Sequence, residues 1–246
     1  AEFAQPILDK MQVLHPPQEA LVSEVSARAY SAENPIKFIL VGAAFFRKGG
    51  REILEVFERL VRQENLPLRL IIVSSLRIEN YAAQETEEDV SWAKEKIAQN
   101  ADWIEYHPEL PNAETIELMR GADVGLLPSY ADTYGFSVLE SQACGLPVIT
   151  TDIRALPEIN NPAVGWLINV PKNALGEALY TTAEEREALS QSIRGGLEQI
   201  VREIAANPAQ IAIKGAAALE RIRREHDPAA YTEALRQVYA LAIPKA

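Results

Sequence analysis

The 246-residue sequence predicts an α/β fold with a parallel sheet of about six strands, helices on both faces and further helices at the C-terminal end. The first observation behind this prediction is that short apolar runs alternate with helical segments between residues 37 and 170, as in β-α-β units. The second is that the runs FILV and LIIV are apolar throughout, which is typical of strands buried on both faces of a parallel sheet.

The first half of the domain is expected to contain four strands, at residues 37–42, 69–74, 103–106 and 124–127. A helix follows Gly49 and Gly50, because apolar residues recur at helical spacing from 53 to 61, and it ends near Pro67. Acidic residues at 85–89 complement the dipole of a second helix, which reaches residue 99. A short helix at 113–120 precedes the fourth strand, which Pro128 ends.

In the second half, a loop leads into a helix at 137–144, which breaks at Gly145 before a strand at 148–151, and a sixth strand is expected at 165–170. Beyond Pro171 the pattern changes to helices, expected at 174–180, 184–206, 208–225 and 228–242. Residues 1–35 contain four prolines and no sustained period, which predicts a connector. Residues 36–227 are then one domain, and 228–246 a C-terminal helix.

The composition, with 48% apolar and 24% charged residues, is that of a globular protein. The formal net charge of −11 opposes unspecific binding to nucleic acid or an anionic membrane, so a phosphate ligand needs a local basic site. No apolar run approaches roughly 18 residues and no signal peptide is recognisable, so we expect no integral membrane segment and a cytoplasmic location. The lone cysteine, Cys144, is expected to be buried and inert, and no Cys/His cluster predicts a structural metal.

Candidate ligand-binding residues follow the first predicted strand, because ligands of parallel sheets bind beyond the carboxyl ends of the strands. The loop after Gly42 brings Arg47 and Lys48 next to Gly49 and the start of a helix, which suits a diphosphate. The alternative is a solvated basic pair. The loop matches neither GxGxxG nor GxxxxGK(S/T), which argues against a dinucleotide-binding enzyme and a P-loop NTPase.

A second candidate site surrounds Asp132 and Glu140, which frame the loop and helix after the fourth predicted strand. Gly135 allows a ligand to approach the backbone, and the N–H groups at the helix start offer an anion site. The two carboxylates suit either the acid and nucleophile of a glycosidase or the holding of sugar hydroxyl groups. The alternative is that neither residue binds a ligand: Glu140 is then a surface residue of the helix, and Asp132 is a turn or cap residue.

Four segments carry a family resemblance in the right order: VGAAFFRKGG, then ADVGLLPSYADTYGFSVLESQACGLPVITTD, then RALPEI and GWLINVP. The region 39–170 that contains them resembles the C-terminal, donor-binding domain of family 4 glycosyltransferases, the retaining members of group 1 with the GT-B fold. The first segment resembles the family's strand with its phosphate-binding loop. The second resembles its E-x7-E segment, the third the following turn, and the fourth its final strand and loop.

The resemblance implies a Rossmann-like domain that binds the nucleotide diphosphate of an activated sugar, with retaining hexosyl transfer and no obligatory metal or other cofactor. It implies that Lys48 neutralises the diphosphate, Glu140 holds the ribose hydroxyl groups and Asp132 contacts the sugar. The charge that builds on the leaving diphosphate is then stabilised electrostatically. The other residues expected to bind the donor lie in the same two loops: Arg47, Gly49, Tyr134, Gly135, Phe136 and Ser137.

Three departures from the family pattern leave the activity open. Ala43 stands where the family commonly has an arginine, which Arg47 replaces only in part, and Asp132 is one methylene shorter than the usual glutamate. Nothing resembles the family's N-terminal domain, which holds the acceptor. We therefore expect a longer natural protein, residues 1–35 as a remnant of the interdomain region, and little transfer by this chain alone.

The alternative function is a catalytically degenerate domain that binds nucleotide sugars or serves as a scaffold. A related epimerase is disfavoured because the segments match the transferases, and a phosphorylase because no pyridoxal-phosphate lysine setting is recognisable. Three more residues have two interpretations each, of which the second is favoured. His107 approaches a base or lies in a local turn, Arg154 reaches the phosphates or forms a surface ion pair, and Trp103 stacks on a ligand or lies in the core.

Overall fold

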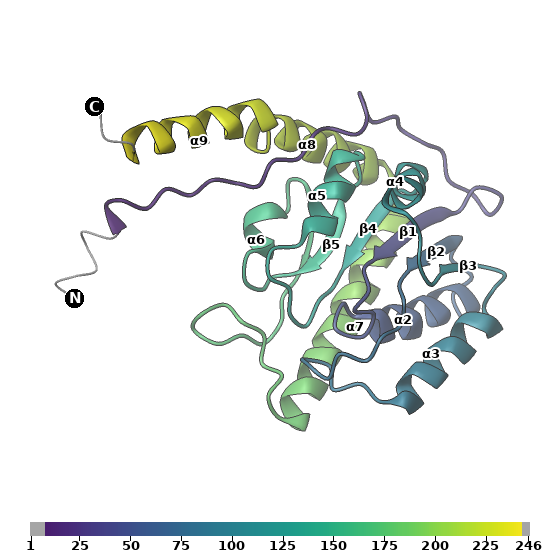
Figure 1. Ribbon diagram of the computed structural model, residues 1–246. Helices are drawn as coiled ribbons and strands as arrows, with labels where there is room; N and C mark the ends of the chain where they lie inside the picture. The colour runs from purple at the N-terminus through teal and green to yellow at the C-terminus, as the bar shows by residue number, and fades with distance from the viewer. Residues whose placement is uncertain (1–7, 243–246) are drawn as a thin grey trace.

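The computed structural model describes residues 8–242, and within them a parallel six-stranded sheet has the order β3-β2-β1-β4-β5-β6 (Figure 1). The strands are β1 (Ile36–Val41), β2 (Leu68–Val73), β3 (Ile104–His107), β4 (Val124–Leu127), β5 (Val148–Thr151) and β6 (Gly165–Ile168). The helices are α2 (Gly50–Arg62), α3 (Glu87–Gln99), α4 (Asn112–Gly121), α5 (Phe136–Ala143), α6 (Leu156–Ile159), α7 (Ala183–Ala206), α8 (Ala209–Glu225) and α9 (Pro228–Ala242).

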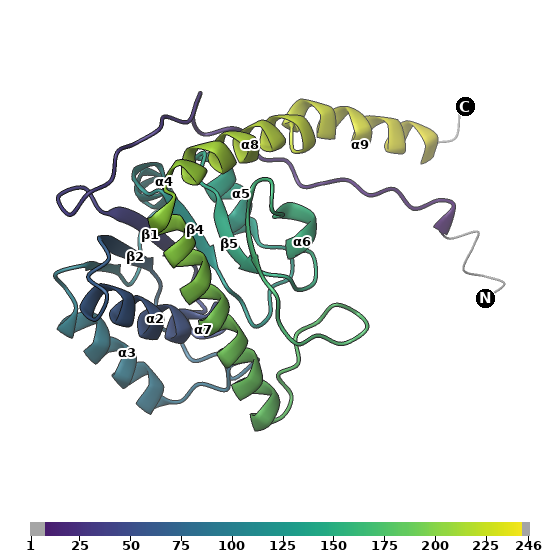
Figure 2. The same ribbon diagram turned by 180° about the vertical axis from the view of Figure 1, so that it is seen from behind.

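Helices cover both faces of the sheet, as the two opposite views show (Figures 1 and 2). On the face of α2, α3 and α7, Phe38 of β1 packs edge-on against Phe57 of α2, with 5.0 Å between the ring centroids. On the opposite face, Ile39 shares a buried cluster with Met119 of α4. Because consecutive β1 side chains are buried on opposite sides, the prediction of strands buried on both faces is confirmed.

The strands and helices expected from the sequence lie within about three residues of the observed ones, except that α2 ends at Arg62 rather than near Pro67 and that one expected helix is not observed. The helix expected at 174–180 is wrong, because Lys172 and Ala178 form an isolated antiparallel bridge there. Asn173 Oδ1 accepts a hydrogen bond from the N–H of Glu177 at 3.1 Å, and Gly176 has a φ of 75°. A side chain that satisfies the backbone inside a turn competes with helix formation, which explains the error.

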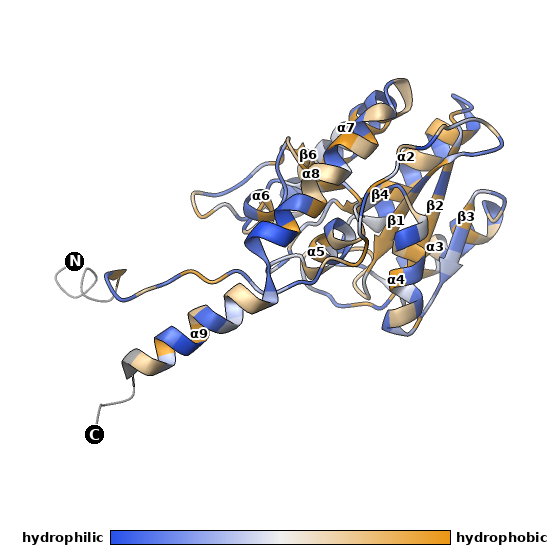
Figure 3. Ribbon diagram, turned by 90° about the horizontal axis from the view of Figure 1, so that it is seen from above, coloured by the Kyte–Doolittle hydropathy of each residue, from blue (hydrophilic) through white to orange (hydrophobic). Residues whose placement is uncertain are grey.

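Residues 18–30 lie against the domain, although the sequence predicts a connector. The N–H of Gln18 donates to the carbonyl of His226 at 2.8 Å, and Arg28 and Tyr30 both bond to the buried Asp123. α9 extends away from the sheet, and the start of the described chain runs in the same direction (Figure 3). No helix within residues 8–242 is long and apolar enough to cross a membrane.

Candidate functional site

The candidate site lies at the carboxyl edge of the sheet, between β1 and β4. The strand order reverses there, since β2 follows β1 on one side and β4 lies on the other. Loops that follow two such neighbouring strands diverge around a crevice, which is the usual ligand site of an open parallel sheet. The loop after β1 carries Lys48, and the loop after β4 carries Asp132.

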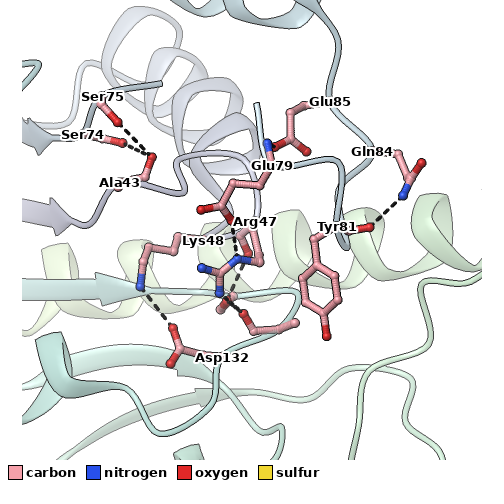
Figure 4. Close-up of polar contacts among 12 residues, drawn as sticks. Ala43, Arg47, Lys48, Ser74, Ser75, Glu79, Tyr81, Gln84, Glu85 and Asp132 are labelled. Carbon is pink, nitrogen blue, oxygen red and sulfur yellow. Dashed lines mark hydrogen bonds and ion pairs between the residues drawn. The ribbon is translucent and has the colours of Figure 1, made fainter. Parts of the chain in front are cut away.

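Lys48 and Asp132 form an ion pair across these two loops, with 3.1 Å between Nζ and Oδ2 (Figure 4). Their side chains are only 13% and 12% exposed, so water screens the pair less than it would a surface pair. The stem of Lys48 lies over Gly42, where a Cβ would come within 2.3 Å of Lys48 Cε. Gly42 is therefore required for this position of the lysine.

Two glycines with positive φ bring the backbone of the site close together. Gly49, at φ 79°, begins α2, and a Cβ there would lie 2.4 Å from the carbonyl oxygen of Pro128 in the opposite loop. Gly135, at φ 91°, begins α5, and a Cβ there would meet Leu156 at 2.7 Å. Both positions therefore need glycine for conformation as well as for space.

The start of α5 presents the expected anion-binding backbone. The first N–H groups of a helix have no intrahelical acceptor, and they include those of Phe136 and Ser137. The Phe136 ring is 63% exposed and lies 5.5 Å from the Tyr134 ring. Tyr134 Oη in turn lies 3.4 Å from Nδ1 of His15, in the segment that precedes the sheet. The sequence-predicted residues of this loop therefore gather at one helix end.

Glu140 lies one turn further along α5 and is partly buried. Burial raises the pKa of its carboxyl group, while the nearby Lys48 ammonium acts in the opposite direction. Within residues 8–242 no hydrogen bond to this carboxylate is observed. Its acceptor capacity is therefore available to a ligand.

Arg47 is placed differently from Lys48, although the two are adjacent in the sequence. Its Nε donates to Glu79 at 2.9 Å and its Nη1 to the carbonyl of Ala131 at 2.6 Å (Figure 4). Arg47 and Ala43 also line different hollows, of about 420 and 360 Å³ respectively. The guanidinium therefore does not occupy the surroundings of Ala43.

The sequence missed the contribution of the loop between β2 and α3, although it placed this loop on the ligand edge. Glu79 and Tyr81 line the same hollow as Arg47, Asp132 and Arg154. No recognisable motif marks these residues. The only available signal was that they follow a strand whose carboxyl end meets the site.

Of the three residues with two interpretations, Arg154 forms the favoured ion pair, with Glu177 at 2.9 Å, although it also lines the hollow beside Asp132. The local turn expected at His107 is wrong, because His107 is the last residue of β3, where it contacts Glu105 of the same strand at 3.0 Å. Trp103 is buried and donates from Nε1 to Asn100. Among the side chains of the described chain, no cluster of three or more His, Cys, Asp or Glu residues is arranged to hold a metal ion.

Two curated relatives match parts of the chain. The O-antigen chain mannosyltransferase B of Escherichia coli is 26% identical over 121 residues, which is 49% of this chain and 30% of the relative. A D-inositol 3-phosphate glycosyltransferase of an Arthrobacter species is 37% identical over 84 residues, which is 32% of this chain and 20% of that protein. The chain thus spans less than a third of the length of either relative.

Solved structures share the fold at low sequence identity. Anabaena Alr3699/HepE in complex with UDP superposes with a TM-score of 0.61 at 15% identity, covering 85% of this chain and 50% of that one. The C-terminal domain of a glycosyl transferase group 1 family protein (LpcC) from Francisella tularensis gives 0.56 at 16% identity, covering 78% of this chain and 87% of that one. Residues 23–196, well over half of the chain, match the family model, and the chain therefore belongs to the family of glycosyl transferases group 1.

Proposed function

We propose that this chain is the donor-binding domain of a retaining glycosyltransferase that transfers a hexosyl group from a nucleotide-diphosphate sugar. The observation that carries the proposal is the pairing of Lys48 with Asp132 in the crevice between β1 and β4, beside the start of α5. The Anabaena protein of the same fold was solved in complex with UDP and with UDP-glucose, which supports this ligand class.

Lys48 and the N-terminal N–H groups of α5 supply positive charge for the diphosphate. A diphosphate that approaches Lys48 competes with Asp132 for the ammonium group, because both are anionic acceptors. The released Asp132 carboxylate then accepts hydrogen bonds from sugar hydroxyl groups. The same positive charge stabilises the leaving diphosphate as the bond to the sugar breaks.

Glu140 is proposed to hold the ribose hydroxyl groups, because its partly buried carboxylate is available to a ligand. Gly49 and Gly135 let the ligand approach backbone at the starts of α2 and α5. The remaining proposed donor-binding residues surround these positions: Arg47, Tyr134, Phe136 and Ser137.

The acceptor is proposed to bind to an N-terminal domain outside this chain. Support comes from the coverage of solved relatives, since this chain covers about half of the Anabaena protein. α9 leaves part of its apolar stripe uncovered, with Val238 37% and Tyr239 64% exposed. We propose that α9 packs against that domain.

Calorimetry with UDP, GDP and ADP tests the proposed ligand class. We expect at least one of them to bind the wild-type chain, and Lys48→Ala to weaken that binding about tenfold or more, because a charge-assisted contact is lost. Lys96→Ala is the matched control, since Lys96 of α3 forms an ion pair with Glu58 of α2 at 2.8 Å. No binding at millimolar concentration, or an equal effect of the two variants, would contradict the proposal.

One observation favours the degenerate alternative as a second candidate. The charge of Lys48 is balanced by Asp132, so the site offers less net positive charge to a diphosphate than Lys48 alone would. A transfer assay with the chain joined to its N-terminal half separates the two candidates. Nucleotide binding without any transfer would favour a binding or scaffolding domain.

A further inference from the structure

Beneath the two loops of the candidate site lies a buried carboxyl group that the proposed function does not use. Glu52, on the first turn of α2, is 1% exposed and lies beside the apolar core residues Ile53 and Leu54. Its Oε1 accepts hydrogen bonds from Tyr130 Oη, at 2.7 Å, and from Ser190 Oγ. Burial raises the pKa of Glu52, because desolvation disfavours the charged form.

These contacts connect three elements that are distant in the sequence. Glu52 lies on α2, Tyr130 in the loop between β4 and α5, and Ser190 on α7. Tyr130 and Ser190 are each 6% exposed, and hydroxyl groups buried this deeply need hydrogen-bond partners. Glu52 supplies a partner for both, so the loop is tied to two long helices that pack on the sheet.

On its other side, Tyr130 ties its loop to the loop that carries Lys48. Its N–H donates to the carbonyl of Arg47 at 2.8 Å, and Ser129 Oγ donates to the same carbonyl at 3.0 Å. The Arg47 guanidinium donates back to the carbonyl of Ala131 at 2.6 Å. The two loops are therefore joined by a short set of hydrogen bonds centred on Arg47 and Tyr130.

We propose that Tyr130, anchored by Glu52 and Ser190, is a positioning residue that keeps Asp132 opposite Lys48. Tyr130 precedes Asp132 by two residues and bonds to the residue before Lys48, so a movement of Tyr130 moves both members of the ion pair. The effect on donor binding rests on the proposed function. The effect on the loop does not, because it requires no ligand.

Stability alone gives little reason for an acid at position 52. A buried acid and hydroxyl both lose water on folding, and replacing both by apolar groups of similar shape is often neutral or stabilising. The double variant Glu52→Leu/Tyr130→Phe, made and compared in a Ser190→Ala background so that no buried hydroxyl group loses its acceptor, therefore separates positioning from stability. We expect it to keep or raise the melting temperature while it loosens the loop.

The amide of residue 130 reports the loop position in the ligand-free chain, since it donates to the carbonyl of Arg47. We expect its hydrogen exchange, followed by NMR, to be about tenfold faster in the double variant, while the amides of α2 are unchanged. Tyr30→Phe is the matched control, because it removes a tyrosine–carboxylate bond of 3.1 Å to Asp123, at the other end of β4. Unchanged exchange at residue 130 in the double variant would overturn the proposal.

Calorimetry with UDP then tests the consequence for binding. We expect Tyr130→Phe to weaken UDP binding about fivefold, but less than about twofold in a Lys48→Ala background, because Tyr130 acts through the ion pair. Glu52→Gln, which keeps an acceptor for Tyr130, is expected to bind UDP like the wild type. Equal losses in both backgrounds, or a Glu52→Gln variant as weak as Tyr130→Phe, would refute a positioning role. If the wild-type chain binds no nucleotide, the proposed function fails, and the exchange measurement alone decides the positioning role.

Discussion

Glu140 lies partly buried one turn into α5, and burial raises the pKa of its carboxyl group because the charged form loses hydration. A raised pKa in the folded state means that protonation favours folding. The stability linked to Glu140 is therefore fully present below the unfolded pKa and is lost as the pH rises through the folded value. At neutral pH this carboxylate costs stability, which is consistent with a side chain placed for a ligand.

We expect Glu140→Gln to change stability and binding in opposite directions. As the pH rises from 4 to 7, the melting temperature of Glu140→Gln should increase relative to that of the wild type, because the amide does not ionise. Its affinity for a nucleoside diphosphate sugar should fall about tenfold, because an amide accepts fewer hydroxyl hydrogen bonds than a carboxylate. Thermal melts across the pH range and calorimetry measure the two effects.

Glu109→Gln, which changes an exposed residue of the β3–α4 loop, is the control for Glu140→Gln. Identical pH profiles for Glu140→Gln and the wild type would contradict the burial argument.

The sequence also predicts that Cys144 is buried, and this prediction is confirmed. Burial raises the pKa of its thiol to about 11.

At the scale of elements, the segment before β1 is fastened by one buried side chain. Asp123, 5% exposed at the amino end of β4, accepts from Arg28 at 2.8 Å, from Tyr30 at 3.1 Å and from the N–H of Lys37 at 2.8 Å. Burial with three donors satisfies the carboxylate. The segment that contains Arg28 and Tyr30 and the start of β1 are therefore both held in place by Asp123.

Asp123→Ala is expected to lower the free energy of unfolding by about 2–4 kcal/mol, because it removes a buried acceptor that three hydrogen-bond donors share, one of them a guanidinium group. Urea unfolding measures this loss, and limited proteolysis should cut more readily between residues 20 and 35. Glu117→Ala, which removes an exposed partner of Arg120 on α4, should change stability by less than about 0.5 kcal/mol. Equal stability losses in the two variants would rule out the fastening role.

At the scale of the whole molecule, α9 stands apart from the layered domain (Figure 3). Its apolar residues remain partly uncovered, so it contributes little buried area to the domain. Truncation after Asp227 is therefore expected to change the melting temperature by less than about 3 °C. Calorimetric melts of the two chains measure this difference, and a loss of cooperative unfolding would show that α9 belongs to the domain core.

The sequence by itself determined the order and approximate bounds of nearly all strands and helices, and the two loops that carry Lys48 and Asp132. These features depend on local properties: apolar spacing, and glycines such as Gly49 and Gly135 at positive φ. The helix expected at 174–180 failed for a local reason as well, since the Asn173 side chain replaced helical hydrogen bonds.

Only the tertiary structure decided which of these residues meet. Lys48 and Asp132 are 84 positions apart, and their pairing depends on β1 lying beside β4. The turn of Arg47 toward Glu79 and the burial of Glu52 under Tyr130 likewise depend on loops and helices from distant parts of the chain. Such contacts follow from the packing of whole elements and from the rotamers that this packing allows, which no short stretch of sequence specifies.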